Sequence, residues 1–253
     1  MRRRALLARG LAWTPFTALL SACGGGGSAS AGGPAGPGLS GVDVSAHTYG
    51  AATSDAEAAR FLQQAQFSST EADIAAVRRG SYASWLADQI NAPMGQTGWD
   101  WLEQRGYGRN DKHQFFFTDY PADYMVWKQL LSSPDAVRQR MALALSEFFV
   151  ISINGSEFTW RSHAVAHWWD TLVGHAFGNF RQLLEAVTLH PAMGQYLNTR
   201  GNQKENPATA RLPDENYARE VLQLFSVGLV QLNPAGMPKR GPDGKPLPTY
   251  GAE

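Results

Sequence analysis

The sequence contains one cysteine, no long run of apolar residues and no strongly basic segment. Cys23 is the only thiol among 253 residues, so no disulfide can form within the chain and a folded domain has to be stabilised by its core. Basic and acidic side chains balance at 22 each, and Arg78 and Arg79 are the only adjacent arginines beyond the N-terminal end. Binding to nucleic acid requires clustered positive charge that neutralises phosphates. The composition therefore argues against a nucleic-acid partner.

The N-terminal segment has the pattern of a cleaved export signal. Three arginines at residues 2–4 precede a mostly apolar stretch over residues 5–20, which is too short to remain in a bilayer as a permanent span. Cleavage before Cys23 would leave 18 basic and 22 acidic side chains, a net charge of −4. We therefore expect residues 1–22 to be a signal peptide and the rest of the chain to be exported.

The end of this segment, Leu20-Ser21-Ala22-Cys23, resembles the lipobox of bacterial lipoproteins at every position. A branched apolar residue and two small residues precede a cysteine that becomes lipid-modified and N-terminal. The resemblance implies acylation of Cys23 and stable attachment to the cell envelope, because several acyl chains anchor a protein stably. The expected location is the outer membrane. An ordinary secretory signal beside an unmodified thiol is the alternative. Arg3-Arg4 resembles a twin-arginine signal only over a short stretch, so we expect the general secretory route.

Composition divides the rest of the chain into a tether and a domain. Residues 23–52 are rich in Gly, Ser, Ala and Pro and have almost no large apolar side chains. Such a segment cannot bury enough surface to offset its chain entropy, so we expect a disordered tether with a reach on the order of 30 Å. Residues 53–253 remain for the folded domain, and we find no internal repeat in them.

Helix signals follow one another through residues 53–253, and no alternating apolar pattern is long enough for a strand. We therefore predict an all-α fold, a multi-helix single domain with long irregular connections. Ser54 and Glu57 predict a capping box in which the Glu57 side chain reaches back to the N-cap. Helices are expected near residues 54–65, 70–79, 82–92, 121–131, 133–149, 157–177, 180–189 and 213–227, and an irregular aromatic segment over residues 95–119.

Two of these helices are expected to bury apolar stripes. On the helix that begins near Pro121, the residues predicted to face inward are Tyr124, Trp127, Leu130 and Leu131. The next helix has the strongest start signal, with Ser133 at the N-cap, Pro134 at the first position and Asp135 in the first turn. Its apolar residues predict that it is buried; they are Val137, Met141, Leu145, Phe148 and Phe149.

The start of the last predicted helix, Asp214–Glu220, is the richest polar segment of the chain. Glu215 and Arg219 are four residues apart, as are Asn216 and Glu220, so each pair lies on one stripe of the helix. Helix capping plus an exposed salt bridge explains this pattern, and a functional site is the alternative. Such a site would combine Glu215, Glu220, Arg219 and His190 as catalytic residues with Asn216 and Asn198 as binding residues.

His163, His167 and Asp170 form a second candidate group. Their spacing places all three on one side of a predicted helix, and two imidazoles with a carboxylate can hold zinc or iron. Three tryptophans share this helix, so a partly buried aromatic helix with histidines at its polar margin is the favoured interpretation. We therefore predict no metal site and retain these residues as alternative ligands, while the cofactor stays unknown. His190 lies at a helix end, where an imidazolium would interact well with the helix dipole, and helix capping is its favoured role.

Several blocks of sequence carry a family resemblance. They are ARFL at residues 59–62, RMALAL at 140–145, HAFGNFRQLL at 175–184, LHPAMGQYL at 189–197, PDENYARE at 213–220 and LFSVG at 224–228. In this order they resemble a large bacterial family catalogued as domain of unknown function 1800. The resemblance covers most of residues 55–228 and implies an exported, mainly helical domain without an established activity. Similar members continue with a further helical region, so we expect the sequence to be a partial copy.

These observations favour a binding or assembly protein of the bacterial cell envelope that holds a partner protein or a glycan. The sequence has no Gly-x-Ser-x-Gly elbow, and its thiol is expected to carry lipid. The aromatic segment from Trp99 to Trp127 is a candidate sugar contact, although aromatic residues more often fill cores.

The alternative is an envelope hydrolase that uses carboxylates of the segment Asp214–Glu220, with or without a metal. Two acids on one helix are poorly placed to flank a substrate. The two functions predict different environments: a catalytic Glu215 or Glu220 should be buried with a raised pKa, whereas a binding residue should be exposed or paired with Arg219. The sequence leaves open whether the protein is an enzyme.

Overall fold

The structure, a computed structural model, describes residues 50–110, 115–154 and 157–249. Cys23, the expected signal peptide and nearly all of the expected tether lie outside these ranges. The helices are α1 (Asp55–Ala65), α2 (Glu71–Arg78), α3 (Tyr82–Asn91), α4 (Gly98–Gln104), α5 (Tyr120–Ser132), α6 (Ala136–Phe148), α7 (Arg161–His175), α8 (Phe180–Thr188), α9 (Pro191–Tyr196) and α10 (Asn216–Arg219), with short 3₁₀ turns η4 (Phe115–Phe117) and η5 (Pro207–Thr209). Because the described residues form only isolated β-bridges besides these helices, the all-α prediction is confirmed.

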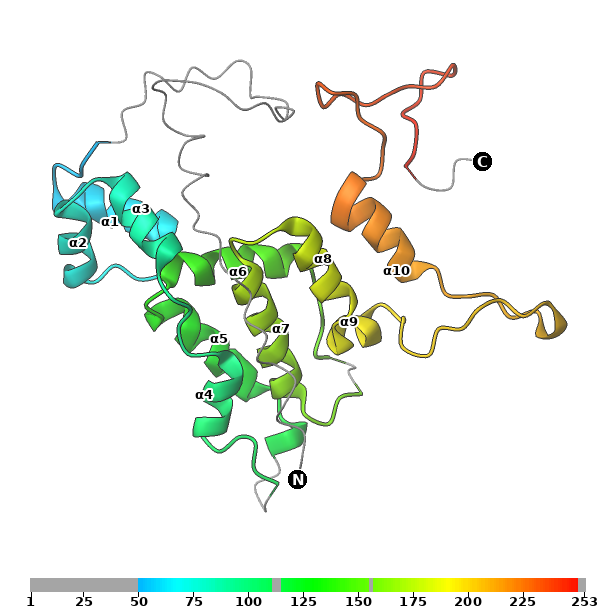
Figure 1. The fold of residues 1–253 in the computed structure, drawn as a ribbon, viewed down its shortest axis with the longest axis horizontal. Helices are drawn as coiled ribbons and strands as arrows, with labels where there is room; N and C mark the ends of the chain where they lie inside the picture. Colours follow the sequence, from blue (N-terminus) through cyan, green and yellow to red (C-terminus); the bar gives the residue numbers. More distant parts are fainter. Residues whose placement is uncertain (1–49, 111–114, 155–156, 250–253) are drawn as a thin grey trace, which may run out of the picture. The chain divides into compact units, whose positions relative to one another are not determined.

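The central element of the fold is α7, which packs against α4, α5, α6, α8 and α9 (Figure 1). Its buried residues Ala166, Trp168, Trp169 and Leu172 belong to the larger of two apolar cores. Full burial of a side chain the size of Leu contributes about 1.5–3 kcal/mol, so this core supplies much of the driving force for folding. A smaller core joins α1, α2 and α3 around residues such as Leu62.

Side-chain caps fix where several helices begin. The Ser54 hydroxyl accepts from the Glu57 amide, as predicted, but the Glu57 carboxylate accepts from the Thr53 amide at 2.7 Å, one residue before the expected partner. Thr70 and Ser81 each form the reciprocal capping box with the residue three positions later. Asn179 accepts from the first amides of α8, which confirms the predicted start of that helix.

Two predictions for the aromatic half of the domain are wrong. The segment expected to be irregular contains α4. Thr97 caps the start of this helix, because its hydroxyl accepts a hydrogen bond from the Asp100 amide at 3.0 Å. On α5, Leu130 is buried as predicted, but Tyr124, Trp127 and Leu131 are exposed. The face of α5 that packs on the domain is instead formed by Ala122, Met125, Gln129 and Leu130.

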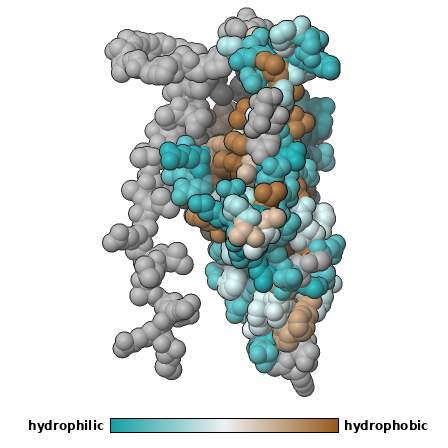
Figure 2. Space-filling model, turned by 90° about the vertical axis from the view of Figure 1, so that its right-hand side faces the viewer, coloured by the Kyte–Doolittle hydropathy of each residue, from teal (hydrophilic) through white to brown (hydrophobic). Residues whose placement is uncertain are grey.

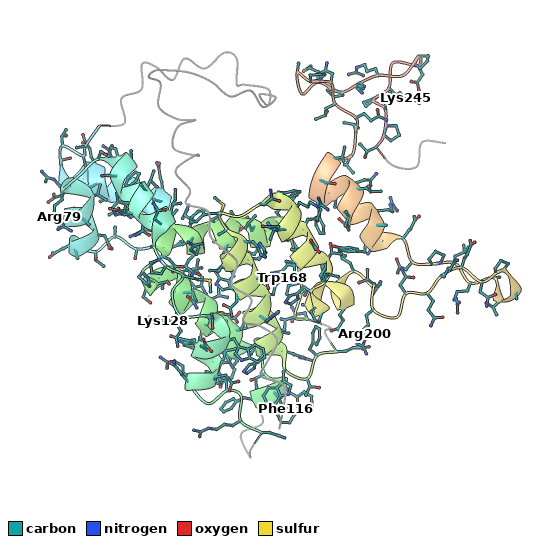
Figure 3. All side chains as sticks on the ribbon, viewed as in Figure 1. Arg79, Phe116, Lys128, Trp168, Arg200 and Lys245 are labelled. Atoms are coloured by element: carbon teal, nitrogen blue, oxygen red, sulfur yellow. The ribbon has the colours of Figure 1, made fainter. Side chains whose placement is uncertain are left out.

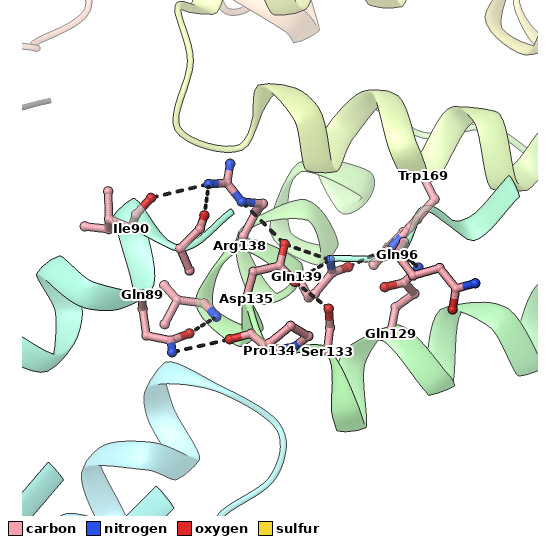
Figure 4. A network of polar contacts seen from close by, with 12 residues as sticks. Gln89, Ile90, Gln96, Gln129, Ser133, Pro134, Asp135, Arg138, Gln139 and Trp169 are labelled. Atoms are coloured by element: carbon pink, nitrogen blue, oxygen red, sulfur yellow. Dashed lines mark hydrogen bonds and ion pairs between the residues drawn. The ribbon is translucent and has the colours of Figure 1, made fainter. Parts of the chain in front are cut away.

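A buried polar network explains why α6 differs from its prediction (Figure 4). The Asp135 carboxylate is fully buried and accepts from the Ser133 hydroxyl and from the Gln139 amide at 3.2 Å, while Arg138 lies 3.4 Å away. Ser133 therefore supports Asp135 instead of serving as the N-cap, and α6 begins at Ala136 with Asp135 at the N-cap position.

The same network links three helices. Arg138 donates to the carbonyls of Ile90 and Ala92 at the end of α3, and Gln139 accepts from the Trp169 indole of α7 at 3.1 Å. Because α6 directs these polar residues inward, two of its apolar residues, Met141 and Phe148, are exposed, and only Phe149 of the expected set is fully buried.

The C-terminal part of the chain also departs from its prediction. The single helix expected over residues 213–227 consists of the short α10 followed by a π-helix, η6 (Glu220–Val227), which ends at Gly228 with a positive φ of 88°. In this part of the chain several apolar side chains are exposed, namely Leu222, Leu224, Val227 and Leu229. Figure 2 shows hydrophobic patches, in brown, among hydrophilic side chains on one face of the molecule. Within the described ranges, no helix has both the length and the apolar character needed to cross a bilayer.

The network predicts a large difference between two carboxylates that each face an arginine. Replacing Asp135 with Asn should lower the free energy of unfolding by about 3 kcal/mol, because Arg138 would keep a buried charge without its counterion. Chemical denaturation of the purified chain measures this change. The control is Asp55→Asn, since Asp55 is 72% exposed beside Arg78 and should cost less than about 0.5 kcal/mol. Equal costs for the two variants would show that the buried network does not stabilise the fold.

Candidate functional site

His190 lies between α8 and α9, and its side chain caps the first turn of α9. Nδ1 of His190 accepts from the Ala192 amide at 3.1 Å, so the residue acts as the N-cap of α9. The capping role expected for His190 is confirmed, and the ring acts as a hydrogen-bond acceptor at the start of α9. The ring also packs on Trp168 of α7, which is labelled in Figure 3, with ring centroids 5.0 Å apart.

The second nitrogen of His190 faces another histidine. Nε2 of His190 lies 2.6 Å from Nδ1 of His167 on α7. Since Nδ1 of His190 accepts a backbone hydrogen bond, the proton of the neutral ring is on Nε2, which donates to His167. His167 then carries its own proton on Nε2. This pair, the His167–His190 dyad, joins an exposed imidazole to a buried one.

Each ring of the dyad carries one proton, and an additional proton has no position on Nδ1 of either ring without loss of a hydrogen bond. A proton on Nδ1 of His190 would face the Ala192 amide, and a proton on Nδ1 of His167 would face the Nε2 proton of His190. Burial, together with the neighbouring His167, lowers the pKa of His190 to about 4. His190 is therefore neutral at pH 7.

The three alternative metal ligands on α7 point to different partners. Nε2 of His163 lies 3.0 Å from the Glu103 carboxylate, and His167 faces His190. Asp170 accepts from the first amides of α4, at 2.6 Å from Gly98, and burial raises the pKa of its carboxyl. Among the described residues, no group of three or more His, Cys, Asp or Glu side chains is arranged to hold a metal ion.

The polar start of the last helix is open to solvent. The Glu215 carboxylate is 61% exposed and lies 3.7 Å from the Arg219 guanidinium, as expected for residues four apart. Asn216 is exposed and Glu220 is half-buried. Tyr217, between them, is buried and its hydroxyl donates to Thr188 at the end of α8, which attaches α10 to the domain. His190, expected to join this group, contacts His167 and Trp168 of α7.

Asn198 follows α9 and has a positive φ of 58°. It lines a cavity of about 260 Å³ between the start of α7 and α9, together with Asn154, Arg161, Gln195 and Tyr196. The Oε1 atom of Gln195 is buried and accepts no hydrogen bond among the described residues. A buried acceptor of this kind requires an N–H or O–H donor, which a water molecule or a ligand can supply. We name this space the α7–α9 pocket.

The α7–α9 pocket is lined by side chains from three separate segments, and its apolar wall includes Ile151, Phe158 and Val165. Ligand pockets for whole small molecules have volumes of about 300–1,000 Å³. The smaller volume here fits one sugar ring or one side chain of a larger partner. Asn198 also lines a second, more open depression together with Arg211, Leu212 and Asp214.

Sequence reasoning proposed Asn198 but missed the rest of the α7–α9 pocket and the His167–His190 dyad. The pattern placed His167 and His190 in two unrelated groups, because 23 residues separate them and no periodicity connects a helix with a later N-cap. Arg161 and Gln195 lie in ordinary helical context. The one available signal was the block at residues 189–197, which contains His190, Gln195 and Tyr196 and ends directly before Asn198.

The fold and this site define a helical domain whose polar residues line small surface pockets. A family model described as a protein of unknown function, DUF1800, matches residues 60–241. The chain therefore belongs to the DUF1800 family, as the sequence resemblance indicated. Neither a curated protein nor a solved structure matches the chain significantly.

The dyad predicts a loss of stability in mild acid. The pKa of His190 is about 4 in the folded protein and about 6.5 in an unfolded chain. The unfolded state therefore binds more protons between these values, and the free energy of unfolding should fall by about 2 kcal/mol as the pH drops from 6.5 to 4. Denaturation at several pH values measures this dependence.

The control for this prediction is His190→Asn, because Asn is a favourable N-cap that does not titrate in this range. The variant should lose the part of the pH dependence between pH 6.5 and 4 that wild type shows. Identical slopes for variant and wild type would contradict the assignment of the effect to His190.

Proposed function

We propose that the chain is an exported bacterial lipoprotein, acylated at Cys23, whose helical domain binds a protein or glycan of the cell envelope. The anchor rests on the lipobox resemblance of Leu20–Cys23 and on the composition of residues 23–52. Membership of the DUF1800 family covers the helical domain and leaves its activity open.

The environment of Glu215 is the observation that supports binding over hydrolysis. A general acid has to be held in a site where water is excluded and its pKa is raised. Glu215 is 61% exposed and lies 3.7 Å from the Arg219 guanidinium. The exposed pair suits recognition of a polar partner better than proton transfer.

The α7–α9 pocket supplies the place for the bound group. Its polar side is formed by Asn154, Arg161, Gln195 and Asn198, and the Tyr196 ring, 40% exposed, borders it. Amide side chains and an aromatic ring are the usual contacts for a sugar or for a peptide. The buried Oε1 of Gln195 favours a ligand with a hydroxyl or amide donor, which both envelope glycans and their peptides carry.

The anchor is tested by the mass of the native protein. Expression of the full gene in a bacterial host should give an acylated protein whose N-terminal residue is Cys23, detectable by mass spectrometry and by incorporation of labelled palmitate. Cys23→Ser should abolish the label, because the acyl chain is attached through this thiol. A native product that retains Met1, or an unmodified thiol in an exported protein, would refute the anchor.

The binding site is tested by sedimentation with purified peptidoglycan sacculi and with outer-membrane vesicles. Tyr196→Ala should weaken retention on one of these by about tenfold, because loss of one stacked ring costs about 1–1.5 kcal/mol. Glu215→Gln should bind as wild type does. Phe180→Ala is the control, since Phe180 is 48% exposed and lies outside the pocket.

A hydrolase would behave differently in the same experiment. Wild type would release soluble fragments from the sacculi, and Glu215→Gln would abolish this release while leaving retention unchanged. That result, or equal retention of Tyr196→Ala and wild type, would contradict the binding proposal.

A further inference from the structure

The outward face of α5 carries a row of large apolar side chains. Tyr120, Tyr124, Trp127 and Leu131 are 40%, 60%, 58% and 49% exposed, respectively. They are four, three and four residues apart, so they form one narrow stripe along the helix. This spacing is the a and d pattern through which two helices pack by knobs-into-holes contacts. We name it the α5 stripe.

The domain holds the α5 stripe in a fixed orientation. On the opposite face of the helix, Met125 is fully buried, and the Gln129 side chain donates to the Gln96 carbonyl at 2.7 Å. Packing of α5 against α4, α6 and α7 leaves the stripe on the outside. A rigid helix with exposed aromatic residues loses little conformational entropy on association, and such residues dominate many interfaces.

Charged residues flank the stripe with opposite signs. Asp123 and Lys128 are both exposed, on the two sides of the row formed by Tyr124 and Trp127, and Figure 3 marks Lys128 on α5. They are five residues apart, which is the separation of the g position of one helix and the e position of a parallel partner. Two parallel copies of α5 therefore place each Asp123 beside the Lys128 of the other copy.

We propose that the α5 stripe is a self-association surface through which two copies of this chain form a parallel, two-fold symmetric pair. The symmetry brings each stripe residue against its own counterpart and forms two Asp123–Lys128 ion pairs across the interface. An antiparallel pair would instead bring like charges to the same side. The charge pattern thus favours a second copy of this chain as the partner and a parallel orientation of the two α5 helices. The inference does not depend on the anchor or on the α7–α9 pocket.

The size of the stripe predicts a dimer that dissociates readily. Aromatic side chains offer about 150–250 Å² each, so the exposed parts of the stripe amount to roughly 400 Å² per copy and about 800 Å² in a pair. This area is below that of a standard stable interface, and we expect a dissociation constant on the order of 10 μM. A bilayer is a poorer occupant, because Asp119, which precedes α5, and Asp123 are exposed and anionic headgroups repel them.

Charge exchange tests the pair directly by sedimentation equilibrium of the full chain over a range of concentrations. Asp123→Lys and Lys128→Asp should each weaken dimerisation by about tenfold or more, since two attractive contacts become repulsive. The double variant Asp123→Lys/Lys128→Asp should restore the wild-type constant. Mixing the two single variants should give a heterodimer, because opposite charges then meet at both contacts.

The control is Lys204→Asp, an exposed charge reversal on a different segment, which should leave dimerisation unchanged. Both exchanged residues are exposed, so circular dichroism should show that the variants remain folded. A wild-type chain that is monomeric up to about ten times the expected constant overturns the proposal. Charge reversals that leave the dissociation constant of the dimer unchanged also overturn the proposal. A monomeric chain whose retention on sacculi or vesicles is reduced by Trp127→Ala overturns it as well, because the stripe would then bind the envelope.

Discussion

The buried carboxylate of Asp135 is the constraint around which the domain is arranged. A buried charge is tolerated only when its hydrogen-bonding capacity is met, and here Ser133, Arg138 and Gln139 meet it. Arg138 and Gln139 in turn connect to α3 and to Trp169 of α7. The network therefore fixes the rotation of α6 about its own axis and links the smaller apolar core to the larger one.

The helix α7 shows how one element distributes its polar residues among its neighbours. His163 faces Glu103, His167 faces the N-cap of α9, and Asp170 caps α4. Each of these contacts connects α7 to a neighbouring element: His163 and Asp170 contact α4, and His167 contacts the N-cap residue of α9. Residues whose spacing resembles a metal site in sequence therefore connect helices. Among these contacts, the His167–His190 dyad is expected to lose stability in mild acid, because burial and the neighbouring His167 lower the pKa of His190 to about 4.

The exposed apolar residues of the C-terminal part and those of α5 differ in their arrangement. The C-terminal part is attached through Tyr217 and Phe225, while neighbouring leucines of η6 remain exposed. A π-helix brings residues five apart into register, as in the contact of the Gly228 amide with the Gln223 carbonyl, and rotates the side chains away from an α-helical pattern. On α5 the exposed apolar residues instead have a regular helical spacing and are flanked by charged residues. The apolar surface of η6 is therefore scattered, whereas the α5 stripe has the regular pattern that a partner helix requires.

The sequence by itself determined the fold class, the family and most helix starts, because capping residues and Pro or Gly punctuation act within one turn of the chain. Ser54, Thr70 and Asn179 are examples whose side-chain caps the structure contains. Only the tertiary structure decided which face of α5 and α6 is buried and which histidine meets His190. Those outcomes depend on contacts between residues 23 to 72 positions apart, and apolar periodicity alone does not state whether a stripe will meet the core or another molecule.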